Sequence, residues 1–182
     1  GKPITGFGDP NGKILIVGLA PAAHGGTRTG RVFTGDKSSD FLYKCLFNAK
    51  ISNQSTSNHI NDGLKLKEAF ITPALKCVPP EDKPLKIELK NCSKFFNNEL
   101  NILKNLKVVV ALGKIAFDTC KIFYKHKFHI PSEFQFGHGK IYTLENGVKL
   151  VGCYHPSPRN VNTGRINEKK MTNLFKKVKK LN

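Results

Sequence analysis

The segment Lys13–Gly26 reads Lys-Ile-Leu-Ile-Val-Gly-Leu-Ala-Pro-Ala-Ala-His-Gly-Gly. Its apolar run at 14–17 predicts a buried strand. The residues that follow are nearly all glycine, alanine or proline, so little side-chain bulk stands above the carboxyl end of that strand. Open α/β sheets bind their ligands at this edge. The segment therefore predicts an α/β sheet with a ligand site at the end of its first strand.

Polar and aromatic groups follow the glycines. His24, Arg28 and Arg31 are polar or cationic, and Phe33 offers a flat apolar face. Taken alone, the segment also fits a glycine-rich turn with a solvated arginine pair. The rest of the chain must decide between the two.

Apolar strand patterns and amphipathic helix patterns alternate along the remaining sequence. Strands are expected at 13–19, 69–72, 108–113 and 148–154, the last in a hairpin with 140–144. Helices are expected at 40–49, 85–104, 115–123 and 168–181. This alternation predicts the α/β class: a three-layer α/β/α sandwich around a four-stranded parallel sheet. The length of 182 residues suits a single domain over 1–182.

The charge balance points to a polyanionic partner. The chain has 30 Lys and Arg against 13 Asp and Glu, a formal net charge of +17, which favours nucleic acid ahead of an anionic membrane. No apolar run reaches the roughly 20 residues of a membrane span, and no signal peptide is visible. Five cysteines, an odd number, argue against a disulfide framework. We expect an intracellular (cytoplasmic) protein that acts on DNA or RNA.

A second polar segment follows the last expected strand. His155–Asn160 reads His-Pro-Ser-Pro-Arg-Asn, and its two prolines predict a stiff loop that does not fold as a helix. Such a loop would hold His155 at the carboxyl edge and project Arg159 outward. Ser157 and the backbone N–H groups of Arg159 and Asn160 are candidates for phosphate contacts. An ordinary proline-rich turn is the alternative.

Together, Gly18–Asp36 and His155–Asn160 resemble the two signature motifs of the type-5 uracil-DNA glycosylases. Shorter segments also resemble that family: Gly6–Pro10, Cys77–Pro84 and Phe136–Gly139. The resemblance spans essentially the whole chain and implies a uracil-DNA glycosylase-like fold. It also implies a monomer that excises a deaminated base from double-stranded DNA, with uracil as substrate and hypoxanthine or xanthine as further ones. Such enzymes turn the nucleotide out of the base stack.

The resemblance also implies residue roles. Phe33 stacks on the extruded base and His155 donates a hydrogen bond toward uracil O2. The group expected to bind the base comprises Gly18, Ala20, Pro21, His24 and Phe33. The group expected to contact DNA comprises Arg28, Arg31, Ser157, Pro158, Arg159 and Asn160.

No carboxylate stands where sister families carry one in the first motif, because Leu19 and Ala20 occupy those positions. Asp36, taken as a catalytic candidate, and Asp40 are the nearest carboxylates, and each fits a helix cap equally well. The lack of a carboxylate in the first motif is consistent with a dissociative route, in which the attacking water needs little help from a general base. Pro73 also departs from many relatives, which place an asparagine there to read the base, so a broad substrate range is expected.

The cysteines divide into two groups. By resemblance, Cys77 and Cys92 match the second pair of ligands of a [4Fe–4S] cluster, which needs four thiolates. The first pair lies upstream in the family, and we expect the full-length protein to carry it together with the cluster; loss of the cluster is the alternative. A zinc site is an alternative with no better ligand count. Cys45, Cys120 and Cys153 are expected to be small buried hydrophobes.

Two other functions stay open. One is a nucleic-acid-binding relative without catalysis, and the other is an α/β enzyme acting on mononucleotides. The second is weakened because the glycine-rich loop has neither a Walker lysine nor a dinucleotide fingerprint. Retention of His155 and Phe33 favours the glycosylase over the first.

Overall fold

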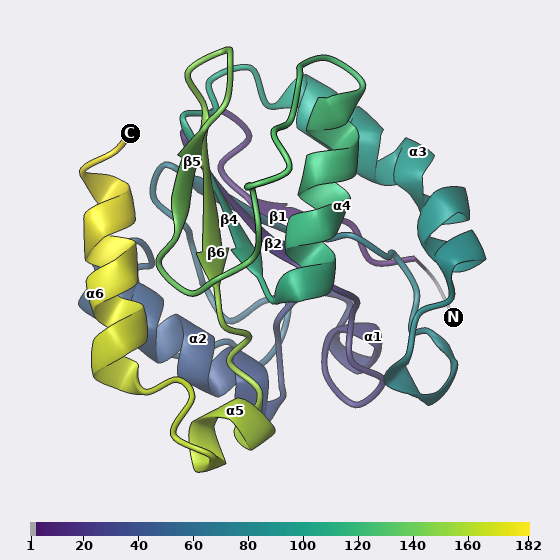
Figure 1. The fold of residues 1–182 in the computed structure, drawn as a ribbon. Helices are drawn as coiled ribbons and strands as arrows, with labels where there is room; N and C mark the ends of the chain where they lie inside the picture. Colours follow the sequence, from purple (N-terminus) through teal and green to yellow (C-terminus); the bar gives the residue numbers. More distant parts are fainter. Residues whose placement is uncertain (1–2) are drawn as a thin grey trace.

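The computed structural model describes residues 3–182 (Figure 1). Its centre is a six-stranded sheet in the order β1-β3-β2-β4-β6-β5. The strands are β1 (Phe7–Gly8), β2 (Ile14–Gly18), β3 (Ala69–Pro73), β4 (Val108–Leu112), β5 (Ile141–Thr143) and β6 (Lys149–Cys153). The four inner strands are parallel, and β1 and β5 run antiparallel at the two edges. The predicted parallel sheet and hairpin are confirmed, and β1 is an edge strand that the sequence did not reveal.

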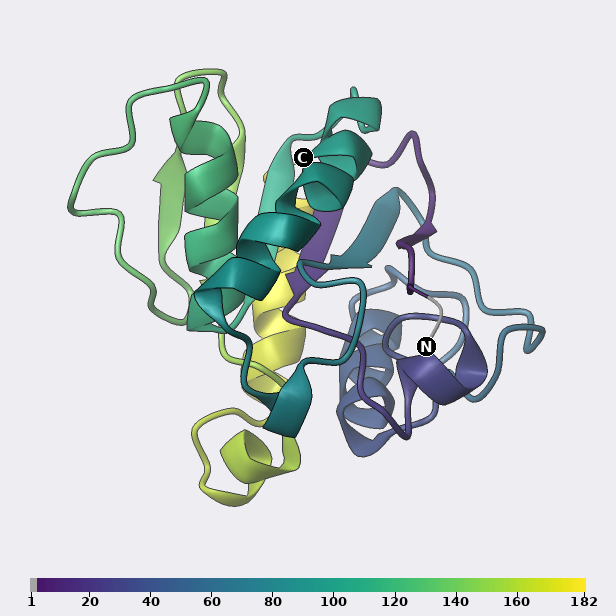
Figure 2. The same cartoon turned by 90° about the vertical axis from the view of Figure 1, so that its right-hand side faces the viewer.

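Helices cover both faces of this sheet. They are α1 (Gly26–Thr29), α2 (Lys37–Asn48), α3 (Lys86–Ile102), α4 (Lys114–Lys125), α5 (Pro158–Asn162) and α6 (Glu168–Lys179), with a 3₁₀ turn at Pro80–Asp82. Helices α3 and α4 lie over one face (Figure 2) and α2 and α6 over the other (Figure 1). The three-layer α/β/α architecture is therefore confirmed.

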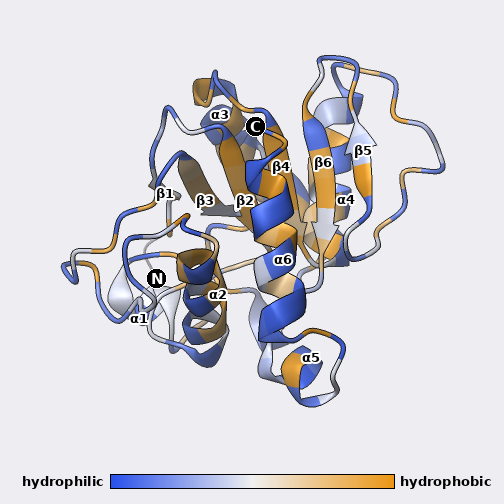
Figure 3. Cartoon of the chain, turned by 90° about the vertical axis from the view of Figure 1, so that its left-hand side faces the viewer, coloured by the Kyte–Doolittle hydropathy of each residue, from blue (hydrophilic) through white to orange (hydrophobic). Residues whose placement is uncertain are grey.

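Each face of the sheet buries its own core. All five residues of β2 and all five of β4 are buried, as expected for central strands of a parallel sheet. Because side chains alternate along a strand, Ile14 and Ile16 pack toward α2 and α6, whereas Leu15 and Val17 pack toward α3 and α4. Figure 3 shows the apolar strands β4 and β6 behind the hydrophilic outer face of α6.

Two helix starts differ from expectation. Helix α2 begins at Lys37, three residues before the predicted start, and Asp36 is its cap. Helix α5 begins at Pro158, with Ser157 as its cap, so the expectation that this segment could not be helical is wrong. Proline is accepted at the first helical position because that N–H needs no intrahelical partner.

The parallel strands all end at one edge of the sheet, at the bottom of Figure 1. The segments that leave β2, β4 and β6 meet there, together with α1, α5 and the start of α4 (Figures 1 and 2). None of the helices in residues 3–182 is long and apolar enough to cross a bilayer.

Candidate active site

Two glycines at the carboxyl edge make room for two aromatic rings. Gly18 ends β2, and a Cβ added there would lie 2.5 Å from Cε2 of Phe33. Gly113 follows β4, and a Cβ there would lie 3.7 Å from Cβ of His155. Since β2 and β4 are neighbours, the two rings meet, with centroids 6.0 Å apart and planes inclined by 36°. The fold thus joins residues 122 positions apart in the sequence.

Phe33 is held in an uncommon backbone conformation. Its φ is +47°, in the left-handed region that bulky residues seldom adopt. Its side chain is largely buried, with 8% of the residue exposed. Strain of this kind persists only where the surroundings enforce it, and it concentrates at functional sites.

The backbone around His155 is held from three directions. Gly113 N–H donates to the Cys153 carbonyl at 2.8 Å, and Tyr154 N–H donates to Nδ1 of His138 at 3.2 Å. Beyond the histidine, Asn160 Nδ2 donates to the carbonyl of His155 itself at 2.9 Å. These bonds fix the backbone from which the imidazole projects.

Burial sets the protonation state of His155. It lowers the pKa of His155 from its ordinary 6.5 to about 4, because a low-dielectric surrounding disfavours the imidazolium. The side chain is therefore neutral at pH 7. A neutral imidazole carries one N–H donor and one acceptor nitrogen.

Asp36 occupies the N-cap of α2. Its Oδ1 accepts from Ser39 N–H at 2.9 Å, and its own N–H donates to Ser39 Oγ at 3.0 Å. Its Oδ2 fills the space beside Gly25 that a Cβ would need. This geometry realises the helix-cap alternative raised from the sequence. Asp40 is exposed in the first turn of α2.

The residues of the glycine-rich loop after β2 that were expected to contact the base or the DNA differ in their exposure to solvent. Pro21 is buried, Ala20 is partly buried, and His24 is exposed. Arg28 is exposed on α1, where its Nε donates to the His24 carbonyl at 2.9 Å and its Nη2 to the Gly35 carbonyl at 3.3 Å. Arg28 thereby closes the loop while leaving part of its guanidinium open to solvent.

Arg31 does not lie on the surface. It is 4% exposed, and its Nη1 and Nη2 donate to Oδ1 and Oδ2 of Asp62 at 2.9 and 2.8 Å. The expectation that Arg31 contacts DNA is wrong, because its guanidinium is committed inside the protein. Asp62 was missed in the sequence, where the Asp-Gly dipeptide signals only a turn.

The α5 segment uses its polar groups mainly on itself. Ser157 Oγ accepts from Asn160 N–H at 3.4 Å, and the Asn160 amide holds the His155 carbonyl as described above. Pro158 and Arg159 are exposed. Of the four residues expected to contact DNA here, these two have the open side chains.

A second buried ion pair supports the end of β3. Lys76 Nζ donates to Glu99 Oε2 at 2.6 Å, to Thr72 Oγ1 at 2.7 Å and to the Pro73 carbonyl at 2.9 Å. Pro73 pairs with Gly18 across the sheet. The network therefore supports the end of β3 beside Gly18, over which the Phe33 ring packs. Its partners are 23 positions apart in the sequence, and only the fold brings them together.

The cysteines separate as expected. Cys45, Cys120 and Cys153 are buried, Cys77 is exposed and Cys92 is partly exposed. Burial lowers the pKa of Lys76, while its bond to Glu99 and the nearby Cys92 oppose that shift. Cys92 thus contributes to the electrostatic surroundings of Lys76, the residue before Cys77. Within residues 3–182, no three His, Cys, Asp or Glu side chains are grouped to hold a metal ion.

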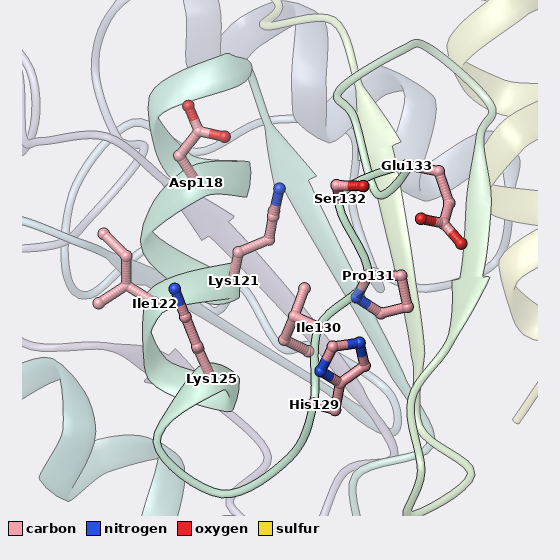
Figure 4. Close-up of a pocket in the computed structure, with 9 residues that line it drawn as sticks. All are labelled: Asp118, Lys121, Ile122, Lys125, His129, Ile130, Pro131, Ser132 and Glu133. Carbon is pink, nitrogen blue, oxygen red and sulfur yellow. The ribbon is translucent and has the colours of Figure 1, made fainter.

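A separate groove of about 750 Å³ lies between α4 and the connector that follows it (Figure 4). Its lining includes Lys121, Lys125 and Glu133, and none of the strand-end residues described above belongs to it. The groove is thus distinct from the site formed by Phe33 and His155.

Comparison with known proteins identifies the family. The model of the Uracil DNA glycosylase superfamily matches residues 5–179. The type-5 uracil-DNA glycosylase of Pyrobaculum aerophilum is 40% identical over 178 residues, covering 98% of this chain and 76% of the relative. That of Thermus thermophilus is 39% identical, covering 99% and 80%, and that of Mycobacterium tuberculosis is 40% identical, covering 100% and 67%.

The fold has a structural counterpart. A solution NMR structure from Methanosarcina acetivorans, assigned as a uracil DNA glycosylase, aligns with a TM-score of 0.58 over 98% of both chains at 13% identity. At that identity the likeness concerns the fold alone. The motifs, the paired rings at the strand ends and the whole-length similarity agree: the chain belongs to the type-5 family of uracil-DNA glycosylases, which are hydrolases of N-glycosyl bonds.

Proposed function

We propose that this protein removes uracil from double-stranded DNA in base excision repair, with Phe33 receiving the extruded base and a neutral His155 stabilising its departure. The observation that carries the proposal is the meeting of the two rings, 6.0 Å apart, above the ends of β2 and β4. One ring offers a stacking face and the other a hydrogen-bond donor. A base stacked on Phe33 would have its oxygens near His155.

Stacking supplies binding energy that does not depend on the identity of the base. A nucleobase stacked on an aromatic side chain gains about 1–3 kcal/mol. Phe33 has no rotational freedom to lose because it is already packed over Gly18. This preorganisation offsets part of the cost of unstacking the nucleotide.

His155 acts on the charge that develops as the bond breaks. Cleavage of the N-glycosyl bond leaves its electron pair on the base, and in uracil that charge spreads to the ring oxygens. A donor already aimed at such an oxygen lowers the barrier electrostatically. A neutral histidine makes this bond without surrendering its proton, and the pKa of about 4 keeps it neutral.

The sugar then takes up water. As the base leaves with the bonding electron pair, C1′ becomes oxocarbenium-like and a water oxygen attacks it. The proton that this water loses passes to solvent, and the anionic base takes up a proton from solvent, so the products are an abasic sugar and the neutral free base. Because Asp36 is engaged at the helix cap, the proposal assigns it no base role. A dissociative order of events needs little base assistance at this step.

Docking on DNA is assigned to the exposed cations that flank the site. Arg28 on α1 and Arg159 on α5 are exposed, and their helices lie at the carboxyl edge, on opposite sides of it (Figures 1 and 2). With a net charge of +17, phosphate contacts would dominate affinity and make it fall with salt. Arg159, exposed beside Pro158, stands in the segment that would enter the space that the base vacates.

The substrate range is proposed to extend beyond uracil to hypoxanthine and xanthine. Pro73 ends β3 next to Gly18 and has neither an amide side chain nor a backbone N–H to read base edges. Discrimination would then depend on shape and on the leaving tendency of the base. Mispaired bases cost least to extrude.

Cys77 and Cys92 are proposed to hold one side of a [4Fe–4S] cluster. Both thiols are at least partly exposed, in contrast to the three buried cysteines, so they are accessible to an iron–sulfur cluster and fit as half of a four-thiolate donor set. The other two ligands would have to come from outside the described residues. When bound, such a cluster would supply a structural cross-link.

The cluster proposal has a test that does not depend on activity. Iron and acid-labile sulfide are measured in the full-length polypeptide purified without air. Cys77→Ser and Cys92→Ser should each lose iron, whereas Cys120→Ser, a buried thiol, should keep it. Equal iron content in all variants would remove the two cysteines from the donor set.

Base release from duplex oligonucleotides tests the main proposal. Duplexes carrying uracil, hypoxanthine or only normal bases are incubated with the protein, and abasic strands are cleaved and counted. We expect product from uracil and none from normal DNA. His155→Ala should abolish release while retaining DNA binding, and His126→Ala, exposed at the end of α4, should match the wild type. Binding without release by the wild type would favour a non-catalytic relative.

A further inference from the structure

We propose that the buried ion pair between Arg31 and Asp62 is the positioning element that keeps Phe33 over Gly18 and beside His155. The inference deepens the proposed function, since it rests on Phe33 receiving the base. It assigns a task to two charged residues that the reaction itself does not use.

The ion pair is built as a rigid anchor. The side chains of Arg31 and Asp62 are 3% and 7% exposed, and the pair is bidentate, with Nη1 donating to Oδ1 and Nη2 to Oδ2. Burial alone would raise the pKa of Asp62, but the bonds from Arg31 and from backbone N–H groups hold it well below its usual range. The carboxylate is therefore charged at any working pH.

Asp62 ties this anchor to a loop rather than to a helix or strand. Its carboxylate accepts from the N–H groups of Asn58, His59 and Leu64 at 2.8, 3.3 and 3.1 Å. The loop is thus folded around the carboxylate. On the other side, the Arg31 guanidinium lies 4.9 Å from the ring centroid of Phe7 in β1.

Ser57 carries the constraint from this loop to the residues that flank Phe33. Its Oγ accepts from Arg31 Nη2 at 2.9 Å and lies 2.8 Å from Thr34 Oγ1. Thr34 Oγ1 in turn accepts from Arg31 Nε at 2.9 Å. The Ser57 carbonyl accepts from Gly35 N–H at 2.8 Å.

The consequence is that Phe33 is held from both sides. Arg31 precedes it by two residues and Thr34 follows it directly, and both belong to one hydrogen-bonded network. This network supplies the enforcement that the positive φ of +47° requires. Without it, the Phe33 backbone would relax to an ordinary conformation and the ring would leave its place over Gly18.

A double-mutant cycle separates positioning from general stability. Single-turnover base release from a uracil duplex is measured for Asp62→Asn, for Phe33→Ala and for the double variant. Asp62→Asn alone should slow release by about 10- to 100-fold, since displacements near 1 Å have that effect. In the Phe33→Ala background it should change release by less than about twofold, because the ring that it positions is gone.

Two controls keep the result interpretable. Ser57→Ala, a milder change in the same network, should show the same pattern with a smaller factor if Asp62→Asn folds poorly. Val178→Ala in α6, a buried core residue, should lower Tm while leaving the rate at the wild-type value. Affinity for undamaged duplex should stay within about twofold of the wild type in every network variant.

The outcomes distinguish a failure of the positioning role from a failure of the proposed glycosylase function. Equal factors from Asp62→Asn in both backgrounds would overturn the positioning role and leave the glycosylase assignment intact. A wild-type rate for Phe33→Ala would remove the stacking platform and the positioning role together. An inactive wild type would instead refute the proposed function itself.

Discussion

Gly18→Ala probes the contact between Gly18 and Phe33 with a single methyl group. Gly18 does not adopt a positive φ, so alanine fits its backbone, and only the space above it is at issue. The new Cβ would lie 2.5 Å from Cε2 and 2.8 Å from Cζ of Phe33. To reach the ordinary contact limit of 3.4 Å, the ring must retreat by about 0.9 Å. A displacement near 1 Å costs up to about 100-fold in rate when it misplaces a reacting group, so we expect a loss of about 10- to 100-fold.

The assay is single-turnover base release from a uracil duplex at saturating enzyme, with Tm measured in parallel. Gly137→Ala is the matched control, because its Cβ would meet only the flexible side chain of Lys140 and its rate should equal that of the wild type. In a Phe33→Ala background, Gly18→Ala should cost nothing further. A wild-type rate for Gly18→Ala, with Tm preserved, would refute the claim that the position of this ring controls the reaction.

Four further predictions address the remaining groups. Because the reaction needs neutral His155 and its pKa is about 4, kcat/KM should hold from pH 8 down to about 5.5 and fall with a midpoint near 4; a midpoint at the ordinary 6.5 would contradict the burial argument. The same group binds protons in the unfolded chain but not in the folded one between pH 6.5 and 4, so its contribution to stability, followed by urea unfolding, should fall as pH is lowered through that window. Asp36→Ala should cost about 1 kcal/mol and lower Tm by about 2–4 °C, whereas Asp36→Ser, which keeps the cap, should restore Tm; a loss of about 100-fold in release by both would make Asp36 a catalytic base after all. Arg159→Ala should weaken binding to any DNA sequence and reduce the slope of log Kd against log salt by about 1, and an unchanged slope would exclude a phosphate contact.

Much of the fold followed from local sequence signals. The run at 14–17 and the valines of β4 are continuous apolar segments, and both are fully buried central strands. The four long helices were placed to within a few residues. What failed were the short elements, β1, α1 and α5, because two to five residues carry no periodicity. Helix α5 failed for a further reason, since proline stops a helix in its interior but begins one at its first position.

Some residues of the candidate site were also predictable from local sequence, and others were not. His155 and Phe33 were singled out because each stands in a distinctive segment that follows a strand, and parallel strands deliver such segments to one edge. Arg31 was misjudged because its sequence neighbours, including Arg28, look like a solvated basic loop. An arginine looks the same in sequence whether it meets a phosphate or a carboxylate. Its partner Asp62 lies 31 positions away.

The sequence by itself determined the sheet class, the edge that bears the site and the two rings that meet there, because these depend on apolar periodicity, on glycine spacing and on two motifs. Only the tertiary structure decided which charged residues face the solvent and which are buried in ion pairs. Burial and pairing are properties of space, and they are set by loops such as the one containing Ser57 and Asp62 folding back onto the first motif. Burial at the strand ends likewise lowers the pKa of His155, which no spacing of residues could have indicated.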